Sequence, residues 1–363
     1  MLSYDATMET PGLTFLNRMS VQAEATASPK AVAAPAQLAQ KPRNEAIDVV
    51  RLFAAVAIVY VHAVRSPALD ASRDLVRFAV PFYLFASFYF QSLSLRSKTD
   101  QTLWQYIVKR TKRLYLPFLA WSGIYMIARD IRRITLLHLG LVRLEPGLLW
   151  KGIEYQLWFL PYLLAGSILL AVIHWTMLRR DRRWRWPLIV VAVAAGFAIA
   201  CTHLPPQWDV AAEGAYVQNY RALPALCWAM AFAWFMTMGP RVYEVSIPVG
   251  FAGIALTIVC SIQQAIHGVE LIPRALTGLG TMLAALAPWR SSWIPSLARI
   301  GRCSFGIYLC HVLVAETVRD VISRTHLPDG PGRDILIFLP TLAGSLALTL
   351  ALARSRRLAW LNG

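Results

Sequence analysis

Charged residues are scarce in this chain. Lys, Arg, Asp and Glu make up 15% of its 363 residues, whereas a soluble globular domain carries about 25%. Hydrophobic residues reach 57% and fall in many separated runs along the whole length. This distribution argues against two or three soluble domains, which the length alone would suggest, and indicates an integral membrane protein.

Cysteine pairs and the short motifs of soluble enzymes are also missing. None of the five cysteines forms a CxxC pair, and all lie in or beside apolar runs: Cys201, Cys227, Cys260, Cys303 and Cys310. They are predicted to be buried small hydrophobic residues, so neither disulfides nor a metal site is predicted. The chain has no P-loop, no GxGxxG after a strand, no HExxH and no GxSxG. The lack of an evident internal repeat disfavours an inverted-repeat transporter.

Acidic residues are the scarcer charged type, with 20 Asp and Glu against 36 Lys and Arg, a net charge of +16. Such a charge could indicate nucleic-acid binding, but the basic residues cluster between apolar runs, as in segments 96–113 and 179–185. Both termini are predicted to be cytoplasmic, because most of these clusters then lie inside, with segment 129–151 as an exception. The charge is therefore interpreted as a topology signal, and no nucleic-acid partner is predicted.

Ten apolar segments predict an all-α, polytopic integral membrane helical bundle. The predicted helices cover residues 47–65, 76–95, 113–129, 156–177, 187–203, 221–239, 246–264, 272–288, 303–319 and 334–353. Several are at the short end of the roughly 20 residues that span a bilayer. The membrane domain is predicted at 45–357, followed by a short tail at 358–363. Residues 1–44 are rich in Ala, Pro, Gln, Ser and Thr, which predicts a disordered cytoplasmic tail and no signal peptide.

The first apolar segment carries three ionisable residues, Asp48, Arg51 and His62. Such groups are costly in lipid, so each is a candidate functional residue. Arg51 and His62 are eleven residues apart, which is close to three helical turns and a rise of roughly 16 Å. They should therefore share one helix face, with Asp48 near it. That face is expected to point into the protein interior.

Five segments together resemble the membrane acyltransferase-3 family. They are IDVVRLFAAVAIVYVH (47–62), with an Arg eleven residues before a His, VPFYLFASFYF (80–90), KRTKRLYLP (109–117), QLWFLPYLL (156–164) and CSFGIYLCH (303–311). They occur in the family's order and extend from about residue 45 to the C-terminal region. One departure is Phe88, which stands where the family usually has Gly after Ser87. The resemblance places Ser87 in a possible acceptor pocket.

The resemblance implies acyl transfer, usually of acetyl from acetyl-CoA as a co-substrate, to a hydroxyl of a sugar or other acceptor. No permanently bound cofactor or metal is expected. Attack of a hydroxyl on a thioester needs a base near neutral pH, and histidine suits this role. His62 is predicted either to deprotonate the acceptor or to carry the acetyl group itself. Arg51 would bind donor phosphate or polarise the thioester carbonyl, and Asp48 would pair with Arg51. The alternative is that His62 makes a polar contact between helices with no chemistry.

Arg110 and Arg113 are the predicted donor-binding residues. They are three residues apart and therefore neighbours on a helix, and arginine binds phosphate with a bidentate fork. On spacing alone, ordinary anchoring beside anionic lipid is the favoured interpretation, and it would also account for Lys109 and Lys112. The resemblance favours binding of the coenzyme A phosphates.

Further candidates for the acceptor pocket come from two later helices. Ser304, Tyr308 and His311 follow at steps of four and three, and His311 is either a second proton-transfer group or a structural histidine. Trp158 and Tyr162 are four residues apart, which suits a sugar platform, although an aromatic belt at the membrane interface is the favoured interpretation. Four acids remain open as contacts to acceptor hydroxyls: Glu154, Asp209, Glu213 and Glu316.

The sequence thus predicts a multi-pass O-acetyltransferase of a bacterial inner membrane. The expected acceptor is a hydroxyl of a cell-envelope or exported polysaccharide, or of its lipid-linked repeat unit, and polysaccharide-assembly proteins are possible partners. A succinyl or other acyl donor is the alternative within the same class. The alternative from another class is a transporter of a lipid-linked sugar or organic anion, with Arg51 and His62 as substrate and proton sites.

Overall fold

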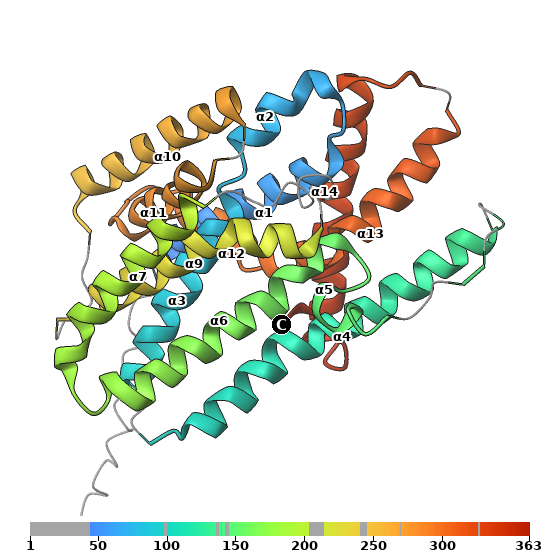
Figure 1. Ribbon diagram of the computed structural model, residues 1–363. Helices are drawn as coiled ribbons and strands as arrows, with labels where there is room; N and C mark the ends of the chain where they lie inside the picture. Colours follow the sequence, from blue (N-terminus) through green and yellow to red (C-terminus); the bar gives the residue numbers. More distant parts are fainter. Residues whose placement is uncertain are drawn as a thin grey trace, which may run out of the picture. The chain divides into compact units, whose positions relative to one another are not determined.

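Helices are the only regular secondary structure in the described part of the chain (Figure 1). The computed structural model describes residues 44–97, 100–135, 138, 140–141, 145–202, 214–239, 245–268, 270–325 and 327–363. The all-α prediction is therefore confirmed for these residues. The predicted N-terminal tail, except Asn44, lies outside them, as do Asp209 and Glu213.

The longer helices coincide with the ten predicted apolar segments. They are α1 (Glu45–Ala63), α3 (Ala79–Ser97), α4 (Leu103–Thr135), α6 (Phe159–Ile173), α7 (Arg185–Ala200), α9 (Ala215–Met236), α10 (Ile247–His267), α11 (Leu271–Leu286), α13 (Ser304–Ser323) and α14 (Pro331–Arg354). The shorter helices are η1 (Pro67–Leu69), α2 (Asp70–Leu75), α5 (Leu148–Lys151), η2 (Tyr155–Trp158), η3 (His174–Leu178), η4 (Arg182–Trp184), α12 (Ile294–Gly301) and η5 (Ala359–Asn362). Each predicted apolar segment thus forms a helix.

Six helical stretches of the described residues are long and apolar enough to cross a membrane. They are Glu45–Ala63, Pro67–Ser97, Tyr155–Leu178, Arg182–Ala200, Ile247–His267 and Pro331–Arg354. The predicted count of about ten spans is not confirmed beyond these six. The helices α4, α9, α11 and α13 form as expected, but none of them combines the length and the apolar composition that a membrane span requires.

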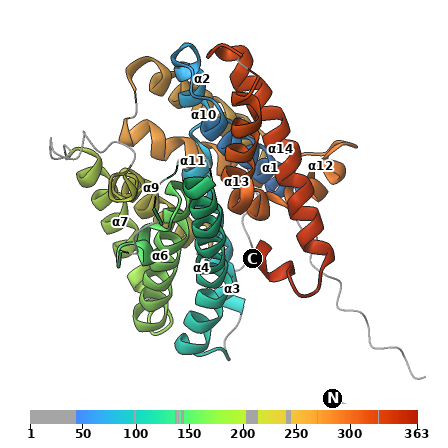
Figure 2. The same ribbon diagram turned by 90° about the vertical axis from the view of Figure 1, so that its right-hand side faces the viewer.

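Helix α1 packs against α3, α11, α12, α13 and α14 (Figures 1 and 2). It begins with an N-cap, because the Asn44 side chain accepts a hydrogen bond from the backbone N–H of Ala46 at 3.1 Å. The end of α12 meets its first turn: a Cβ added to Gly301 would lie 1.8 Å from the backbone oxygen of Asp48. Only glycine allows so close an approach of the two backbones.

Helix α13 continues from α12 and runs parallel to α1. The fully buried Ala55 and Val59 of α1 pack with Ile307 of α13 in one hydrophobic cluster. This seam fixes the register between the two helices. Residues after Ile307 on α13 therefore reach the last turns of α1.

Phe88 on α3 is completely buried and lies against α6. A Cβ added to Gly166 of α6 would come within 2.8 Å of the Phe88 ring. The small residue that allows α3 and α6 to pack is thus on α6, where it accommodates the large side chain. This arrangement resolves the departure at Phe88 noted in the sequence.

The C-terminal residues fold back onto the helices as η5. The indole N–H of Trp121 in α4 donates to the carbonyl of Leu361 at 3.0 Å, and the Asn362 amide donates to the carbonyl of Thr349 at 3.0 Å. Leu361 is buried. The segment at 358–363 is therefore packed against α4 and α14.

Candidate active site

Two histidines from distant parts of the chain meet at the end of α1. The rings of His62 on α1 and His311 on α13 are stacked, with centroids 5.1 Å apart and planes inclined by 23°. Tyr155 of η2 contacts the His62 ring edge-on at 4.8 Å. His62 is half-buried, and His311 is completely buried. The sequence predicted each histidine as a candidate separately, and the structure places them together.

The hydrogen bond of His311 determines which of its nitrogens is basic. Its Nδ1 lies 2.7 Å from the carbonyl oxygen of Tyr308. A carbonyl only accepts, so Nδ1 carries the proton, and in the neutral ring Nε2 holds the lone pair. This buried Nε2 has no hydrogen-bond partner among the described residues. The Tyr308 hydroxyl in turn donates to the carbonyl of Gln156, which ties α13 to η2.

The end of α1 is held by charged side chains from two helices. Nη2 of Arg319 donates to the carbonyls of His62 and Ala63, the latter at 3.1 Å. A cation at the C-terminal carbonyls of a helix also interacts favourably with the helix dipole. The Asp334 carboxylate at the start of α14 accepts from the backbone N–H groups of Arg65 at 3.1 Å and Ser66 at 2.7 Å. The backbone that carries His62 is thus fixed from both α13 and α14.

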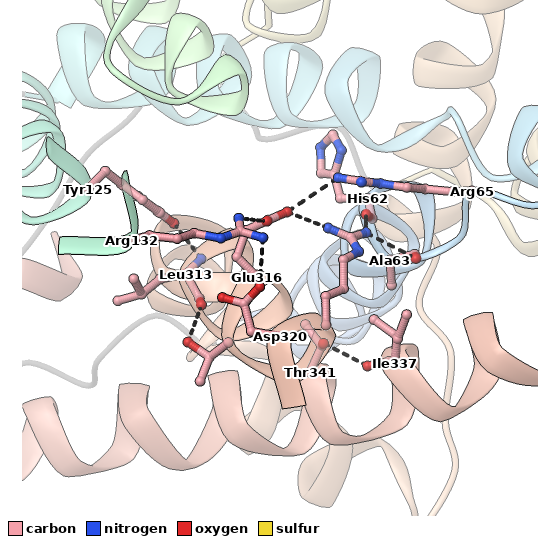
Figure 3. Close-up of polar contacts among 12 residues, drawn as sticks. His62, Ala63, Arg65, Tyr125, Arg132, Leu313, Glu316, Asp320, Ile337 and Thr341 are labelled. Atoms are coloured by element: carbon pink, nitrogen blue, oxygen red, sulfur yellow. Dashed lines mark hydrogen bonds and ion pairs between the residues drawn. The ribbon is translucent and has the colours of Figure 1, made fainter. Parts of the chain in front are cut away.

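A network of ion pairs surrounds this end of α1 (Figure 3). Glu316 pairs with Arg319 at 2.6 Å, with Arg65 at 3.3 Å and with Arg132 of α4. Arg132 also pairs with Asp320 at 2.6 Å. Three guanidinium groups are thus arranged around two carboxylates beside His62.

Sequence reasoning did not identify Arg319, Arg132, Asp320 or Asp334 as site residues, and it named Glu316 only as an open acid. One signal was present. Glu316 and Arg319 are three residues apart in an otherwise apolar helix, so they are neighbours on one face. A charged pair of this kind near the end of an apolar segment points to a partner on a neighbouring helix.

Glu154 lies directly before Tyr155, outside the membrane-spanning segments. Burial raises the pKa of the Glu154 carboxyl, and the charge of Arg129 opposes this effect. Arg129 donates to the carbonyl of Ile153 at 3.2 Å. Among the described residues, no group of three or more His, Cys, Asp or Glu is placed to hold a metal ion.

Asp48 and Arg51 form a second cluster near the start of α1. Their side chains pair at 3.2 Å, as predicted. The Arg51 guanidinium lies 5.5 Å from the centre of the Phe90 ring, and the Tyr83 hydroxyl donates to the Arg51 carbonyl at 3.1 Å. Tyr83, Ser87 and Phe90 follow at steps of four and three on α3, so Ser87 belongs to the helix face that runs past Arg51.

The predicted stripe on α1 therefore has two separate ends. His62 and Arg51 are about 16 Å apart along the helix axis, and the seam of Ala55, Val59 and Ile307 fills the α1–α13 contact between them. Ser304 is buried at the start of α13. The two ends are connected by helix α1, and this seam separates them along the α1–α13 contact.

The predicted donor residues point in different directions. Nε of Arg110 donates to the Ser167 hydroxyl of α6 at 3.2 Å, whereas Arg113 is exposed. Gln91 of α3 donates to the carbonyl of the same Ser167. Ser167 lies twelve residues after Tyr155, which corresponds to a rise of about 18 Å from the His62 end. Arg110 is thus turned into the bundle and Arg113 away from it.

Trp158 and Tyr162 are both buried, with 6% and 5% of their surface exposed. Their rings contact each other edge-on at 5.6 Å. The favoured prediction of an aromatic belt at the membrane interface is therefore wrong for these residues. The hydropathy pattern did not indicate the inward direction of these side chains.

Comparison with known proteins gives one short and one extensive similarity. A serine/alanine racemase of Enterococcus gallinarum is 30% identical over 138 residues, which cover 35% of this chain and 19% of that protein. The chain therefore matches only a small part of that relative's length. No solved structure is significantly similar. The model of the acyltransferase-3 family, described as an acyltransferase domain, matches residues 44–354. This chain belongs to the acyltransferase-3 family.

Proposed function

We propose that this protein transfers an acetyl group from acetyl-CoA to a hydroxyl of a cell-envelope or exported polysaccharide, or of its lipid-linked repeat unit, in a bacterial inner membrane. The observation that supports this most strongly is the stacked pair of His62 and His311 inside the family's acyltransferase domain. Histidine combines a basic nitrogen with a charge state that changes near neutral pH. The half-buried His62 ring is the more accessible member of the pair.

In the direct mechanism, His62 acts as a general base. Its free nitrogen takes the proton of the acceptor hydroxyl while the oxygen attacks the thioester carbonyl. The carbon–sulfur bond then breaks, an ester forms, and the imidazolium returns the proton to the sulfur of coenzyme A. In the relay mechanism, the His62 nitrogen attacks the thioester first, the carbon–sulfur bond breaks, and coenzyme A leaves as the thiol with the proton of the imidazole ring. The acceptor oxygen then takes the acetyl group from the ring, and the hydroxyl proton returns to the ring nitrogen.

The donor is proposed to enter from the end of α1 that carries Arg51. The Arg51 guanidinium lies over Phe90, and the next residue, Gln91, bonds to the same Ser167 that holds Arg110. Arg51 and Arg110 are therefore at a similar level along α3, and both can bind phosphate groups of the donor. The long pantetheine arm of coenzyme A would span the roughly 16–18 Å from this level to His62.

The test uses membranes or purified protein that carry single histidine substitutions. His62→Ala should reduce acetyl transfer from acetyl-CoA by about 10²- to 10⁴-fold, as expected for loss of a general base. His267→Ala is the matched control, because His267 is exposed at the end of α10. It should leave the rate unchanged. Succinyl-CoA is supplied in parallel to identify the acyl group.

A His62→Ala protein that inserts and unfolds like the wild type but keeps its full transfer rate would refute the proposed mechanism. Ion-coupled flux with no release of coenzyme A would instead support the transporter alternative. In cells, the acetate content of the envelope polysaccharides should fall in the His62→Ala strain. Unchanged ester content in every envelope glycan would refute the proposed acceptor class.

A further inference from the structure

Arg274 on α11 is buried, with 5% of its surface exposed, and lacks an acidic partner among the described residues. Its Nη2 donates to the Gln218 side chain at 3.3 Å. Its Nε and Nη1 are buried and have no hydrogen-bond partner in the described part of the chain. Asp74, an acid that lies near Arg274, is paired with Arg77. The guanidinium therefore has two buried nitrogens with hydrogens to donate.

Other buried arginines of this chain use their nitrogens on backbone carbonyls. Arg185 donates to the carbonyls of Thr237 and Met238 at the end of α9. Arg319 donates to two carbonyls at the end of α1 and to Glu316. Arg274 makes no such structural contact among the described residues. Burial of an unpaired guanidinium is costly, so a ligand that pairs with it would recover this free energy.

The helical stretch Tyr155–Leu178 has further buried polar groups without partners among the described residues, and one of them lies near Arg274. The Tyr162 hydroxyl of α6 is buried and unpaired among the described residues, and it lies within electrostatic range of Arg274. The side-chain amide of Gln156 is also buried, with both polar atoms unpaired in the described part of the chain. Unsatisfied buried polar atoms are rare in native proteins. The unpaired Tyr162 hydroxyl beside the unpaired nitrogens of Arg274 indicates a site for a polar ligand.

This region continues to the histidine pair. Tyr155, which contacts His62, and Tyr162, which lies near Arg274, are separated by seven residues of the same helical stretch, about 10 Å. Arg77 lies within electrostatic range of both Arg274 and His62. Arg274 is thus on the His62 side of the bundle, and the proposed donor residues are at the other level. The group it binds belongs to the acceptor.

We propose that Arg274 binds an oxyanion of the acceptor, so that the preferred acceptor is an acidic saccharide. The planar guanidinium matches a carboxylate or a phosphate with two parallel hydrogen bonds. Nη2 has two hydrogens and uses one of them on Gln218, so its second N–H and the unused Nε or Nη1 beside it form one such fork. The oxyanion is either a carboxylate of a sugar acid or a phosphate of the lipid linker. This inference rests on the proposed acetyl transfer and adds the charge of the acceptor.

The experiment compares three acceptors with purified protein in nanodiscs and acetyl-CoA as donor. They are an oligosaccharide of uronic acids, the same oligosaccharide after reduction of its carboxyl groups, and a neutral oligosaccharide linked to a polyprenyl diphosphate. Arg274→Met should raise KM for the acidic acceptor by about 10- to 100-fold, since hydrogen bonds to a charged group are lost. The value of kcat and the KM for the neutral reduced acceptor should stay within about threefold, and Arg274→Lys should be intermediate. Arg299→Met, at an exposed site on α12, is the matched control.

The outcomes separate the two possible oxyanions. Wild-type preference for the uronic acid over its reduced form assigns the carboxylate, whereas preference for the diphosphate-linked acceptor alone assigns the phosphate. A wild type with no preference for either charged acceptor refutes this inference and leaves the proposed function intact. No transfer to any acceptor refutes the proposed function itself.

A second readout distinguishes binding from folding. The charged acceptor that the wild type prefers should raise the Tm of the wild type and of Arg299→Met, but not of Arg274→Met. An equal loss of rate with all three acceptors would show a purely structural role and overturn the inference. If Arg274→Met does not fold, the same three acceptors are compared with Arg274→Lys. If that variant prefers the charged acceptor as strongly as the wild type does, the proposed bidentate binding by Arg274 is refuted.

Discussion

Replacement of Arg319 tests how the position of His62 depends on the clamp at the end of α1. Arg319 has 9% of its surface exposed, and its Nη2 donates to the carbonyls of His62 and Ala63. Its Nη1 donates to Glu316 at 2.6 Å. Lysine keeps the positive charge, but its single ammonium group cannot bind both carbonyls and the carboxylate in the same fork. Arg319→Lys therefore removes the geometry and retains the charge.

The expected magnitude follows from the hydrogen bonds that each substitution removes. One hydrogen bond to a charged donor contributes about 1.5–3 kcal/mol, so Arg319→Lys should lower the free energy of unfolding by about this amount. Arg319→Met removes the charge as well and leaves two carbonyls without their donor, while Glu316 keeps Arg65 and Arg132 as partners, so it should cost more than Arg319→Lys. A shift of about 1 Å in a reacting group lowers the rate by roughly 10²-fold. The value of kcat should therefore fall more than KM for the acceptor changes.

The assay measures thermal unfolding and steady-state acetyl transfer on the same purified samples. Arg324→Lys is the matched control, because Arg324 is exposed at the end of α13, and it should behave as wild type in both measurements. Arg319→Lys with an unchanged Tm would show that the clamp does not hold α1. A lower Tm with an unchanged kcat would show that the position of His62 does not limit the reaction.

Three further predictions concern stability. Gly301→Ala needs a shift of at least 1.2 Å, the difference between the 1.8 Å distance from the added Cβ to the Asp48 backbone oxygen and the 3.0 Å minimum. It should lower the free energy of unfolding by about 1–3 kcal/mol or more. Gly123→Ala in α4, with open space at its Cβ, is the control and should be neutral or slightly stabilising, and equal Tm values for the two variants would refute the clash. Asp334→Ala leaves two backbone N–H groups without their acceptor and should cost about 1–3 kcal/mol, with less loss for Asp334→Asn. Because burial raises the pKa of Glu154, the folded state becomes less stable as pH rises from about 4.3, the ordinary pKa of a glutamate, through the raised pKa of the folded state. Glu154→Gln should therefore have a higher Tm than the wild type at pH 7 and a similar Tm near pH 4. A Tm difference that does not depend on pH would contradict this prediction.

The local features of the fold could be predicted because they depend on neighbouring residues. Helical periodicity alone placed Asp48 beside Arg51 and put His62 on the same helix. The contact of His62 with His311 could not be predicted in this way, since it depends on how α13 packs on α1. Local hydropathy also does not determine the number of membrane spans. The helices α4 and α13 carry charges that pair with each other, as Arg132 does with Glu316 and Asp320, and a hydropathy window penalises such charges.

The direction of individual side chains was the second feature that the sequence did not predict. Arg110 and Arg113 are neighbours on α4, but three residues still differ by about 60° around a helix. This angle is enough to turn one side chain toward Ser167 and expose the other. Arg274 lies inside the predicted segment 272–288, so its charge in an apolar run was a signal that the sequence prediction did not use. Its importance depends on its burial and on the unpaired atoms around it.

The packing along α1 restricts the route of the acetyl group. The seam of Ala55, Val59 and Ile307 is fully buried, so the group cannot move between α1 and α13. Helix α6 and the η2 turn before it offer the other connection, because Gln156 lies at the His62 end and Ser167 at the Arg110 end. Both side chains are buried and polar. The proposed donor path therefore follows α6, and the stripe on α1 marks its two ends.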